Sequence, residues 1–143
     1  MKSNQKGFTL VELVLVITVL GILAVAALPQ FISVRGSALT ASRAGTVGAI
    51  RTGISNLFAA EQVKTTPAAG PAALDAAAAG ACTTANGCFG NVLGTPVSDV
   101  NWVKTATGYT YTDGTLSCDY VYTASTASVI GSFANNPATA GCP

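Results

Sequence analysis

The 143-residue chain has no histidine and little charge, and each shortage excludes a class of function. Without histidine, the commonest general base and a common zinc ligand are both missing. Seven basic residues against six acidic ones give a formal charge of +1, a field too weak to collect nucleic acid by itself. We therefore expect no enzyme and no DNA-binding domain, and we assign no cofactor and no metal ion.

Charged residues make up 9% of the chain, against about 25% in soluble domains, and half of the residues are apolar. Some of the surface should therefore face lipid or other subunits instead of water. The length allows one compact domain with an appendage. Four cysteines, all in the C-terminal half, predict disulfides formed outside the cytoplasm and allow three connectivities: Cys82, Cys88, Cys118 and Cys142.

A short, polar and basic segment, residues 1–7, precedes an apolar run over residues 8–28. This run is long enough to cross a hydrocarbon core of about 30 Å as a helix. Lys2 and Lys6 place its N-terminus on the cytoplasmic side. Four residues interrupt the apolar character of the run: Thr9, Glu12, Thr18 and Gly21.

Beyond Pro29 the helical pattern continues, because apolar residues recur at intervals of about three or four: Phe31, Val34, Val47, Ile50, Ile54, Leu57 and Phe58. We predict one helix over residues 8–61, kinked or loosened between Gly21 and Pro29. Its residues 8–29 form a protruding membrane or filament-core segment, and residues 30–61 form the amphipathic helix of a head. Four glycines in that second half, each unfavourable in a helix, require close packing to offset them: Gly36, Gly45, Gly48 and Gly53.

Residues 62–97 are rich in alanine, glycine, threonine and proline and predict a loop, with one short helical turn at 74–79. The remaining segment, 98–143, predicts an antiparallel sheet of about four strands at 100–106, 109–112, 117–123 and 127–133. The available partner for the sheet is the apolar stripe of the helix: Val47, Ile50, Ile54, Leu57 and Phe58. The expected fold class is therefore α+β. Five aromatic residues of these strands are expected to pack in the sheet: Trp102, Tyr109, Tyr111, Tyr120 and Tyr122. The acids match no calcium loop.

Three arginines, Arg35, Arg43 and Arg51, recur every eight residues along the helix. We expect them to form a solvated face or to pair with acids on neighbouring subunits.

The segment Lys6-Gly7-Phe8-Thr9-Leu10-Val11-Glu12, continued to Pro29 and Phe31, resembles the leader and N-terminal segment of type IV pilins. The resemblance implies that prepilin peptidase cuts between Gly7 and Phe8 and methylates the new N-terminus at Phe8. It implies that Glu12 pairs with the Phe8 amine of a neighbouring copy during assembly, and that the region from Gly21 to Pro29 loosens in the filament.

Two alternatives for this segment stay open. Glu12 could reach toward the lipid headgroups from the cytoplasmic end of the helix. The run could instead be a secretory signal peptide cleaved near Ala24-Val25-Ala26. For the cysteines we predict Cys82 with Cys88, and Cys118 with Cys142; the second pair matches the C-terminal disulfide loop of many pilins. A metal site is disfavoured because histidine and Cys-x-x-Cys spacing are absent.

The resemblance implies a structural subunit, held in the inner membrane with its N-terminus cytoplasmic and then polymerised into an extracellular filament. Its partners would be copies of itself, prepilin peptidase, the assembly machinery of the inner membrane and, before assembly, lipid. The family's roles are adhesion, twitching motility and DNA uptake, so nucleic acid would be met only by the filament. The residues after Pro29 resemble mannose-sensitive haemagglutinin-type pilins. The alternatives are a pseudopilin of a type II secretion system and, from another class, a membrane-anchored enzyme or binding module.

Overall fold

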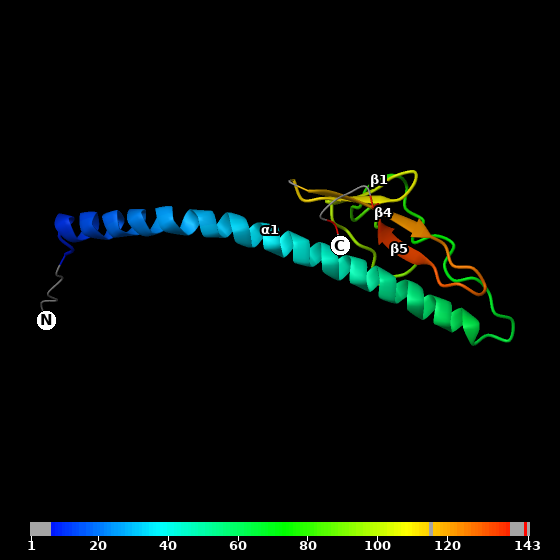
Figure 1. Ribbon diagram of the computed structural model, residues 1–143. Helices are drawn as coiled ribbons and strands as arrows, with labels where there is room; N and C mark the ends of the chain where they lie inside the picture. The colour runs from blue at the N-terminus through cyan, green and yellow to red at the C-terminus, as the bar shows by residue number, and fades with distance from the viewer. Residues whose placement is uncertain (1–6, 115, 138–141, 143) are drawn as a thin grey trace, which may run out of the picture. The chain divides into compact units, whose positions relative to one another are not determined.

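The structure, a computed structural model, describes residues 7–114, 116–137 and 142. The predicted leader therefore lies outside the described residues except for Gly7, and so do the two lysines used for its orientation. The chain divides into two compact units, Met1–Ala38 and Leu39–Pro143. Helix α1, Leu10–Gln62, contributes residues to both (Figure 1).

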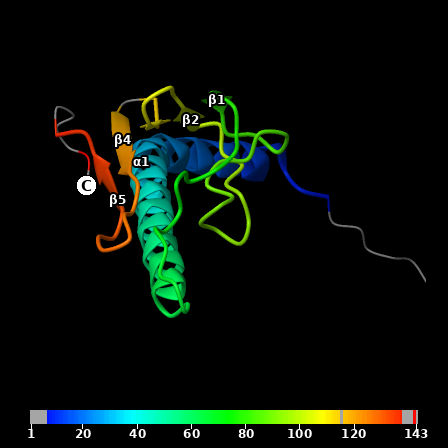
Figure 2. The same cartoon turned by 90° about the vertical axis from the view of Figure 1, so that its right-hand side faces the viewer.

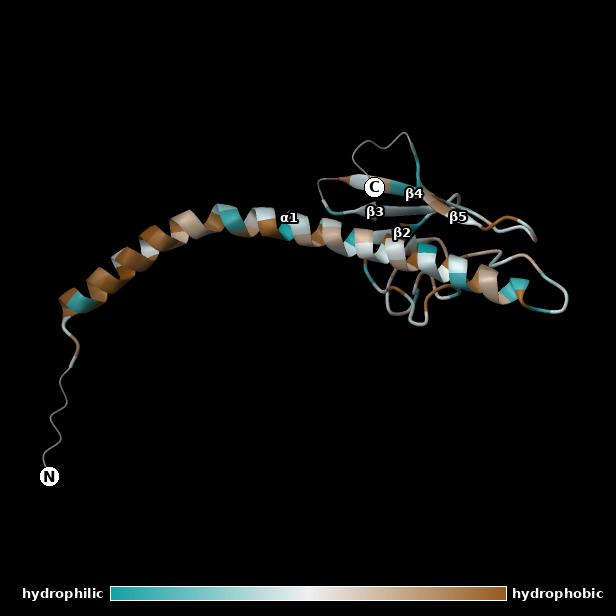
Figure 3. Cartoon of the chain, turned by 60° about the horizontal axis from the view of Figure 1, so that its bottom comes forward, coloured by the Kyte–Doolittle hydropathy of each residue, from teal (hydrophilic) through white to brown (hydrophobic). Residues whose placement is uncertain are grey.

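Helix α1 confirms the long helix expected from the sequence to within two residues at each end. Gly21 and Pro29 are both helical, so no interruption marks the predicted kink, and loosening of this region in a filament stays a prediction. Every described side chain of residues 8–26 is exposed, and Figure 3 shows how strongly apolar this part of α1 is. By length and composition, this stretch of α1 could cross a membrane.

The described residues of the head, Leu39–Pro143, form one antiparallel sheet whose strands lie in sequence order. Its five strands are β1 (Gly80–Ala81), β2 (Trp102–Lys104), β3 (Tyr109–Thr112), β4 (Ser117–Thr123) and β5 (Ser132–Asn135). The register aligns Trp102 with Tyr111 and Tyr111 with Cys118, which places these three side chains in one row on one face. Figure 2 shows most of the 62–97 loop, in green, and strands β4 and β5, in orange and red, on opposite sides of the head part of α1.

The head core joins three buried residues of α1, Val47, Ile50 and Ile54, to the buried row of the sheet. This confirms the predicted stripe, although Leu57 is 36% exposed and Phe58 is half-buried. Aromatic residues make most of the sheet's contribution, as expected from the strand pattern: Trp102, Tyr109, Tyr111, Tyr120 and Phe133.

Phe89, from the loop, lies at the centre of this aromatic core, with its ring 4.4 Å from Tyr109 and 5.4 Å from Trp102. The loop approaches α1 so closely that a Cβ on Gly53 would lie 2.3 Å from the Val92 carbonyl oxygen. Close packing therefore explains Gly53, whereas Gly36, Gly45 and Gly48 face open space within this chain.

Two predictions for the loop and the sheet are wrong. Residues 74–79 form no helical turn, because Asp75 Oδ1 accepts the Ala77 amide at 3.1 Å and Asn86 Oδ1 accepts the Ala78 amide at 3.0 Å. These side-chain acceptors replace helical carbonyls. The two-residue strand β1, which the sequence prediction placed in the loop, pairs with β2 instead.

The last strand lies later in the chain than the predicted 127–133. Thr126 and Ser125 explain the difference, because the Thr126 amide donates to the Val129 carbonyl at 2.8 Å and Gly131 N–H donates to Ser125 Oγ at 2.8 Å. The chain therefore turns before β5, and Val129 is left 61% exposed.

The interpretation of the arginine line is also wrong for one member. Arg43 is 1% exposed and lies in the head core, so it belongs to no solvated face. Arg51, although exposed, donates through Nε to the Phe133 carbonyl at 2.9 Å and so links α1 to β5. Arg35 is exposed and remains compatible with the prediction.

Candidate functional site

The predicted junction at Gly7 and Phe8 is exposed. Phe8 is 90% exposed, and a Cβ built on Gly7 would meet no atom within 4 Å. The backbone at this point precedes the first residue of α1 and is not helical. A protease can bind a cleavage site whose backbone is uncovered and outside regular secondary structure, as it is here.

Glu12 and Thr9 form a reciprocal cap at the start of α1. The Thr9 amide and hydroxyl both donate to Glu12 Oε2, at 3.1 and 3.0 Å, and the Glu12 amide donates to Thr9 Oγ1 at 3.3 Å. This is a capping box, in which each side chain satisfies a backbone donor of the other residue. The Glu12 carboxylate is therefore turned toward the N-terminal end of the helix.

The sequence prediction treated Thr9 as an interruption and missed its role. The spacing Thr-x-x-Glu directly before an apolar run was the available signal. Both cap residues follow Gly7, so a cut after Gly7 would leave the cap in the chain. The other hydroxyl of the apolar run is also satisfied locally, because Thr18 Oγ1 donates to the Leu15 carbonyl at 2.8 Å.

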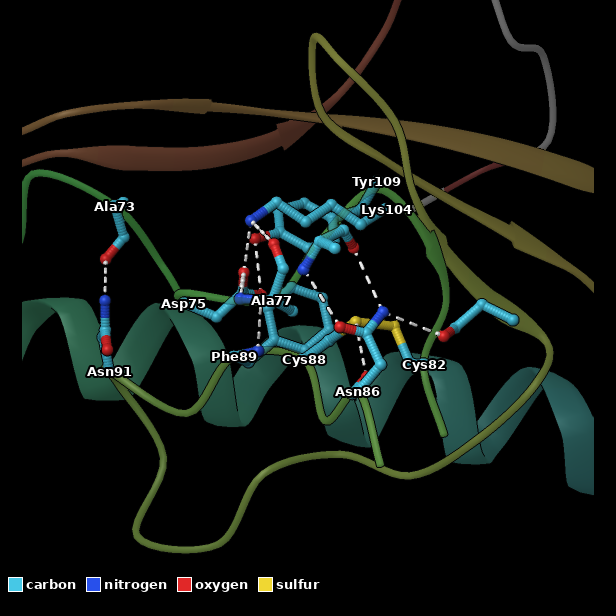
Figure 4. A network of polar contacts seen from close by, with 12 residues as sticks. Ala73, Asp75, Ala77, Cys82, Asn86, Cys88, Phe89, Asn91, Lys104 and Tyr109 are labelled. Atoms are coloured by element: carbon cyan, nitrogen blue, oxygen red, sulfur yellow. Dashed lines mark hydrogen bonds and ion pairs between the residues drawn. A yellow bond between two sulfur atoms is a disulfide. The ribbon is translucent and has the colours of Figure 1, made fainter. Parts of the chain in front are cut away.

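The head contains a second polar cluster, centred on Asp75 (Figure 4). Asp75 is 4% exposed and accepts hydrogen bonds from Lys104 Nζ at 2.5 Å, the Phe89 amide at 2.7 Å and the Tyr109 hydroxyl at 2.7 Å. Lys104 also donates to the Ala77 carbonyl at 2.7 Å. These contacts tie the loop to β2 and β3.

The Asp75 cluster also fixes an unusual backbone conformation. Phe89 has a φ of 64°, which is uncommon for a residue with a bulky side chain. Its amide is the donor to Asp75 Oδ2, and its ring lies in the aromatic core. The buried carboxylate therefore holds Phe89 in a conformation that lets its ring fill the core.

The charge of Asp75 is stabilised despite burial. Burial by itself would raise the pKa of the carboxyl, but the hydrogen bonds from Lys104, Phe89 and Tyr109 and the charge of Lys104 lower its pKa below the usual 3.8. Burial and the adjacent carboxylate together raise the pKa of the Tyr109 hydroxyl. The cluster is thus a structural ion pair at neutral pH.

Both disulfides lie in the head. Cys82 is joined to Cys88, with Cα atoms 5.4 Å apart, and Cys118 is joined to Cys142, with Cα atoms 5.8 Å apart. This is the connectivity that we predicted. Among the described residues, no cluster of cysteines and acids could hold a metal ion.

Comparison with known proteins identifies the N-terminal motif. Residues 2–28 match the family described as the prokaryotic N-terminal methylation motif. Over 107 residues, 75% of this chain, the sequence is 35% identical to the fimbrial protein EcpC of Eikenella corrodens. Over 31 residues, 22% of this chain, it is 61% identical to a type IV major fimbrial protein FimA of Dichelobacter nodosus. The chain is thus similar to type IV pilins and fimbrial proteins, most strongly in its N-terminal motif.

The names of both relatives are those of fimbrial proteins, which supports the expectation that the chain is a structural protein. The chain spans 65% of the length of the EcpC relative and 20% of the length of the FimA relative. No solved structure matches it. The similarity therefore rests on the N-terminal motif and on the alignment with EcpC.

Proposed function

We propose that this chain is the subunit of a type IV pilus and polymerises through the N-terminal part of α1 into a surface filament. The observation that carries the proposal is an apolar run that is exposed over residues 8–26 and contains one carboxylate, Glu12. Such a surface is stable only against lipid or against other apolar helices.

The proposed pathway uses each residue of the motif. Prepilin peptidase cuts after Gly7 and methylates Phe8, while α1 stays in the inner membrane with its N-terminus cytoplasmic. The assembly machinery then transfers the helix from lipid to the filament. An acid inside a span costs about 2.5–3.5 kcal/mol on insertion scales, so Glu12 needs a partner at each stage.

Thr9 is the partner of Glu12 within the chain, and the Phe8 amine of a neighbouring copy is the partner in the filament. Exchange of one for the other would set the axial register of the subunits. Because lipid is as apolar as the helix, close packing and this ion pair, instead of a hydrophobic driving force, would select the assembled state.

The role of the filament is a more specific proposal. We propose that the filament serves in adhesion, twitching motility or DNA uptake, and that nucleic acid binds only to the assembled filament and not to the single chain. The small residues after Pro29 support the further proposal that the chain is a pilin of the mannose-sensitive haemagglutinin type.

The test is expression of the full chain in a pilus-competent host that lacks its own major pilin. Sheared cell-surface material is examined by electron microscopy, and the N-terminus of the protein is identified by mass spectrometry. We expect abundant fibres whose subunits begin with methylated Phe8. Processed chain without surface fibres would contradict the pilus and favour a pseudopilin. A mature chain that begins at Ala27 would identify a signal peptide and overturn the proposal.

A pair of variants separates the cap from the intermolecular ion pair. Glu12→Gln keeps an oxygen that can accept the Thr9 hydrogen bonds but removes the charge, whereas Thr9→Val keeps the charge and removes the hydroxyl. We expect Glu12→Gln to insert and to be processed, yet to lower the fibre yield at least about tenfold, the loss that about 1.4 kcal/mol of subunit contact would cause. Glu61→Gln, in the last turn of α1, is the matched control. Normal fibres from Glu12→Gln would show that assembly does not need the charge of Glu12.

A further inference from the structure

Arg43 is a buried cation whose surroundings the filament proposal does not use. Its guanidinium carbon lies 5.8 Å from the centre of the Tyr111 ring, and its Nη1 donates to Cys118 Sγ at 2.8 Å. Its Nε has no hydrogen-bond partner, and neither ion pair between described residues includes it. A buried guanidinium without a carboxylate is costly, so its position against a sulfur atom calls for a reason.

The two half-cystines of the Cys118–Cys142 disulfide differ in their exposure to solvent. Cys118 is fully buried and contacts Arg43, whereas Cys142 is only partly buried. In the other disulfide, Cys82 and Cys88 are both fully buried. Among the described half-cystines, Cys142 is therefore the sulfur that a nucleophile from solution can reach.

We propose that Cys118–Cys142 is a thiol–disulfide exchange site, attacked at Cys142 by an external thiolate, with Cys118 as the leaving thiolate held by Arg43. A new bond forms between the external sulfur and Cys142 Sγ. The bond between Cys142 and Cys118 breaks, and its electron pair stays on Cys118 as a thiolate. No proton is transferred, because the guanidinium supplies the counter-charge.

The reverse step closes the bond during maturation of the head. The Cys118 thiolate attacks a mixed disulfide at Cys142 and releases the external thiolate. Positive charge beside a thiol stabilises its thiolate, and a more stable thiolate leaves faster. The partner is any thiolate or mixed disulfide that can approach Cys142, and glutathione is a sufficient probe of this chemistry.

The other charged and titratable groups around the site come from the sheet and its connections. Tyr111 and Tyr120 flank Arg43 from β3 and β4, and the charges of Asp99 and Asp113 act on Tyr111. Burial raises the pKa of both tyrosine hydroxyls, so neither forms a competing anion near neutral pH. Arg43 is thus the group in direct contact that can stabilise negative charge on Cys118.

The test uses the oxidised full chain in detergent, treated with reduced glutathione, quenched by alkylation and mapped by mass spectrometry. We expect Cys118–Cys142 to open at least about tenfold faster than Cys82–Cys88 and glutathione to be found on Cys142. Glutathione on Cys118, or earlier opening of Cys82–Cys88, would overturn the proposal.

Arg43→Met tests the role of the charge. Loss of the cation should destabilise the departing Cys118 thiolate and slow the opening of Cys118–Cys142 about 3- to 10-fold. Arg43→Lys should restore part of the rate. Arg51→Met removes the same charge from the same helix without touching sulfur, and should leave the rate unchanged.

The Cys82–Cys88 bond is an internal control for general destabilisation. If Arg43→Met loosened the whole head, both disulfides would open faster. The decisive quantity is therefore the ratio of the two rates within each variant. An unchanged ratio in Arg43→Met, together with an unchanged pH profile for alkylation of Cys118, would show that Arg43 only fills space.

Discussion

The two parts of α1 use apolar residues in opposite ways. In residues 10–28 they surround the helix, and their side chains are exposed, as at Leu10 (78%) and Ile22 (73%). From Leu39 onward they are confined to one stripe, where Ile50 and Ile54 are buried against the sheet. One continuous helix therefore carries a surface for an external apolar partner and a surface for an internal core. Helix propensity is common to both parts, and the difference lies in the spacing of apolar residues.

The largest effect should come from separating the two parts. A chain that begins at Leu39, exported to an oxidising compartment, should stay in solution without detergent, since it keeps the buried core and both disulfides. The full chain should require detergent. High-speed centrifugation of the two proteins, made in the same host, measures the difference. A truncated chain that sediments with membranes would show that the head also contributes membrane affinity.

Replacing the same residue type in each part sharpens the comparison. Ile50→Ala removes a fully buried side chain and should lower the free energy of unfolding of the head by about 2–5 kcal/mol. Ile17→Ala, at a position that is 57% exposed, should leave it unchanged. Trp102 is the single tryptophan and is buried, so its fluorescence during denaturation of the full chain in detergent reports the head alone. Equal losses in both variants would mean that the exposed segment also stabilises the head.

Acid should weaken the head through Asp75. Because its pKa in the folded state lies below 3.8, the stabilisation is fully present above the unfolded pKa and is lost as the pH falls through the folded value. Asp75→Asn should therefore cost about 1.5–3 kcal/mol at neutral pH, and the difference from the unsubstituted chain should shrink as the pH falls below about 4. Denaturation curves across this range measure it.

Asp119→Asn is the control for Asp75→Asn, because Asp119 is exposed and its side chain contacts Thr110 on the sheet surface. It should show little loss at any pH. A constant difference between Asp75→Asn and the unsubstituted chain down to strong acid would mean that the carboxylate charge contributes nothing.

The elements that could be predicted from the sequence are those with a local pattern. Apolar periodicity gave the limits of α1, and alternation in YTYT and SCDYVYT gave β3 and β4 at their observed bounds. β1 could not be predicted, because a Gly-Ala pair has no strand signal and forms a strand only through pairing with Val103 and Lys104. The Thr9–Glu12 cap had a local signal that went unused.

The polar residues of the head needed the fold to be interpreted. Asp75 and Lys104 are separated by 29 positions, and Arg43 and Cys118 by 75. Neither spacing resembles a motif, and regular placement among other arginines made Arg43 resemble a surface residue. Such pairs are set by which loop covers which face of the sheet, information that periodicity does not contain. The same holds for Phe89, whose place in the core depends on a backbone conformation fixed by Asp75.

The smallest effects concern two glycines in the head part of α1, and they test whether that part is packed all around. A Cβ on Gly53 would lie 2.3 Å from the Val92 carbonyl oxygen, which is backbone and can move only with its loop, so Gly53→Ala should destabilise the head by about 1–3 kcal/mol. A Cβ on Gly48 would meet nothing within 4 Å, so Gly48→Ala should stabilise the head by about 0.5–1 kcal/mol through helix propensity. Trp102 fluorescence in denaturant measures both. Opposite signs would show that α1 is packed in the head at Gly53 and open at Gly48. A stabilising Gly53→Ala would contradict the close approach of the 89–92 loop, and a destabilising Gly48→Ala would contradict the open space at Gly48.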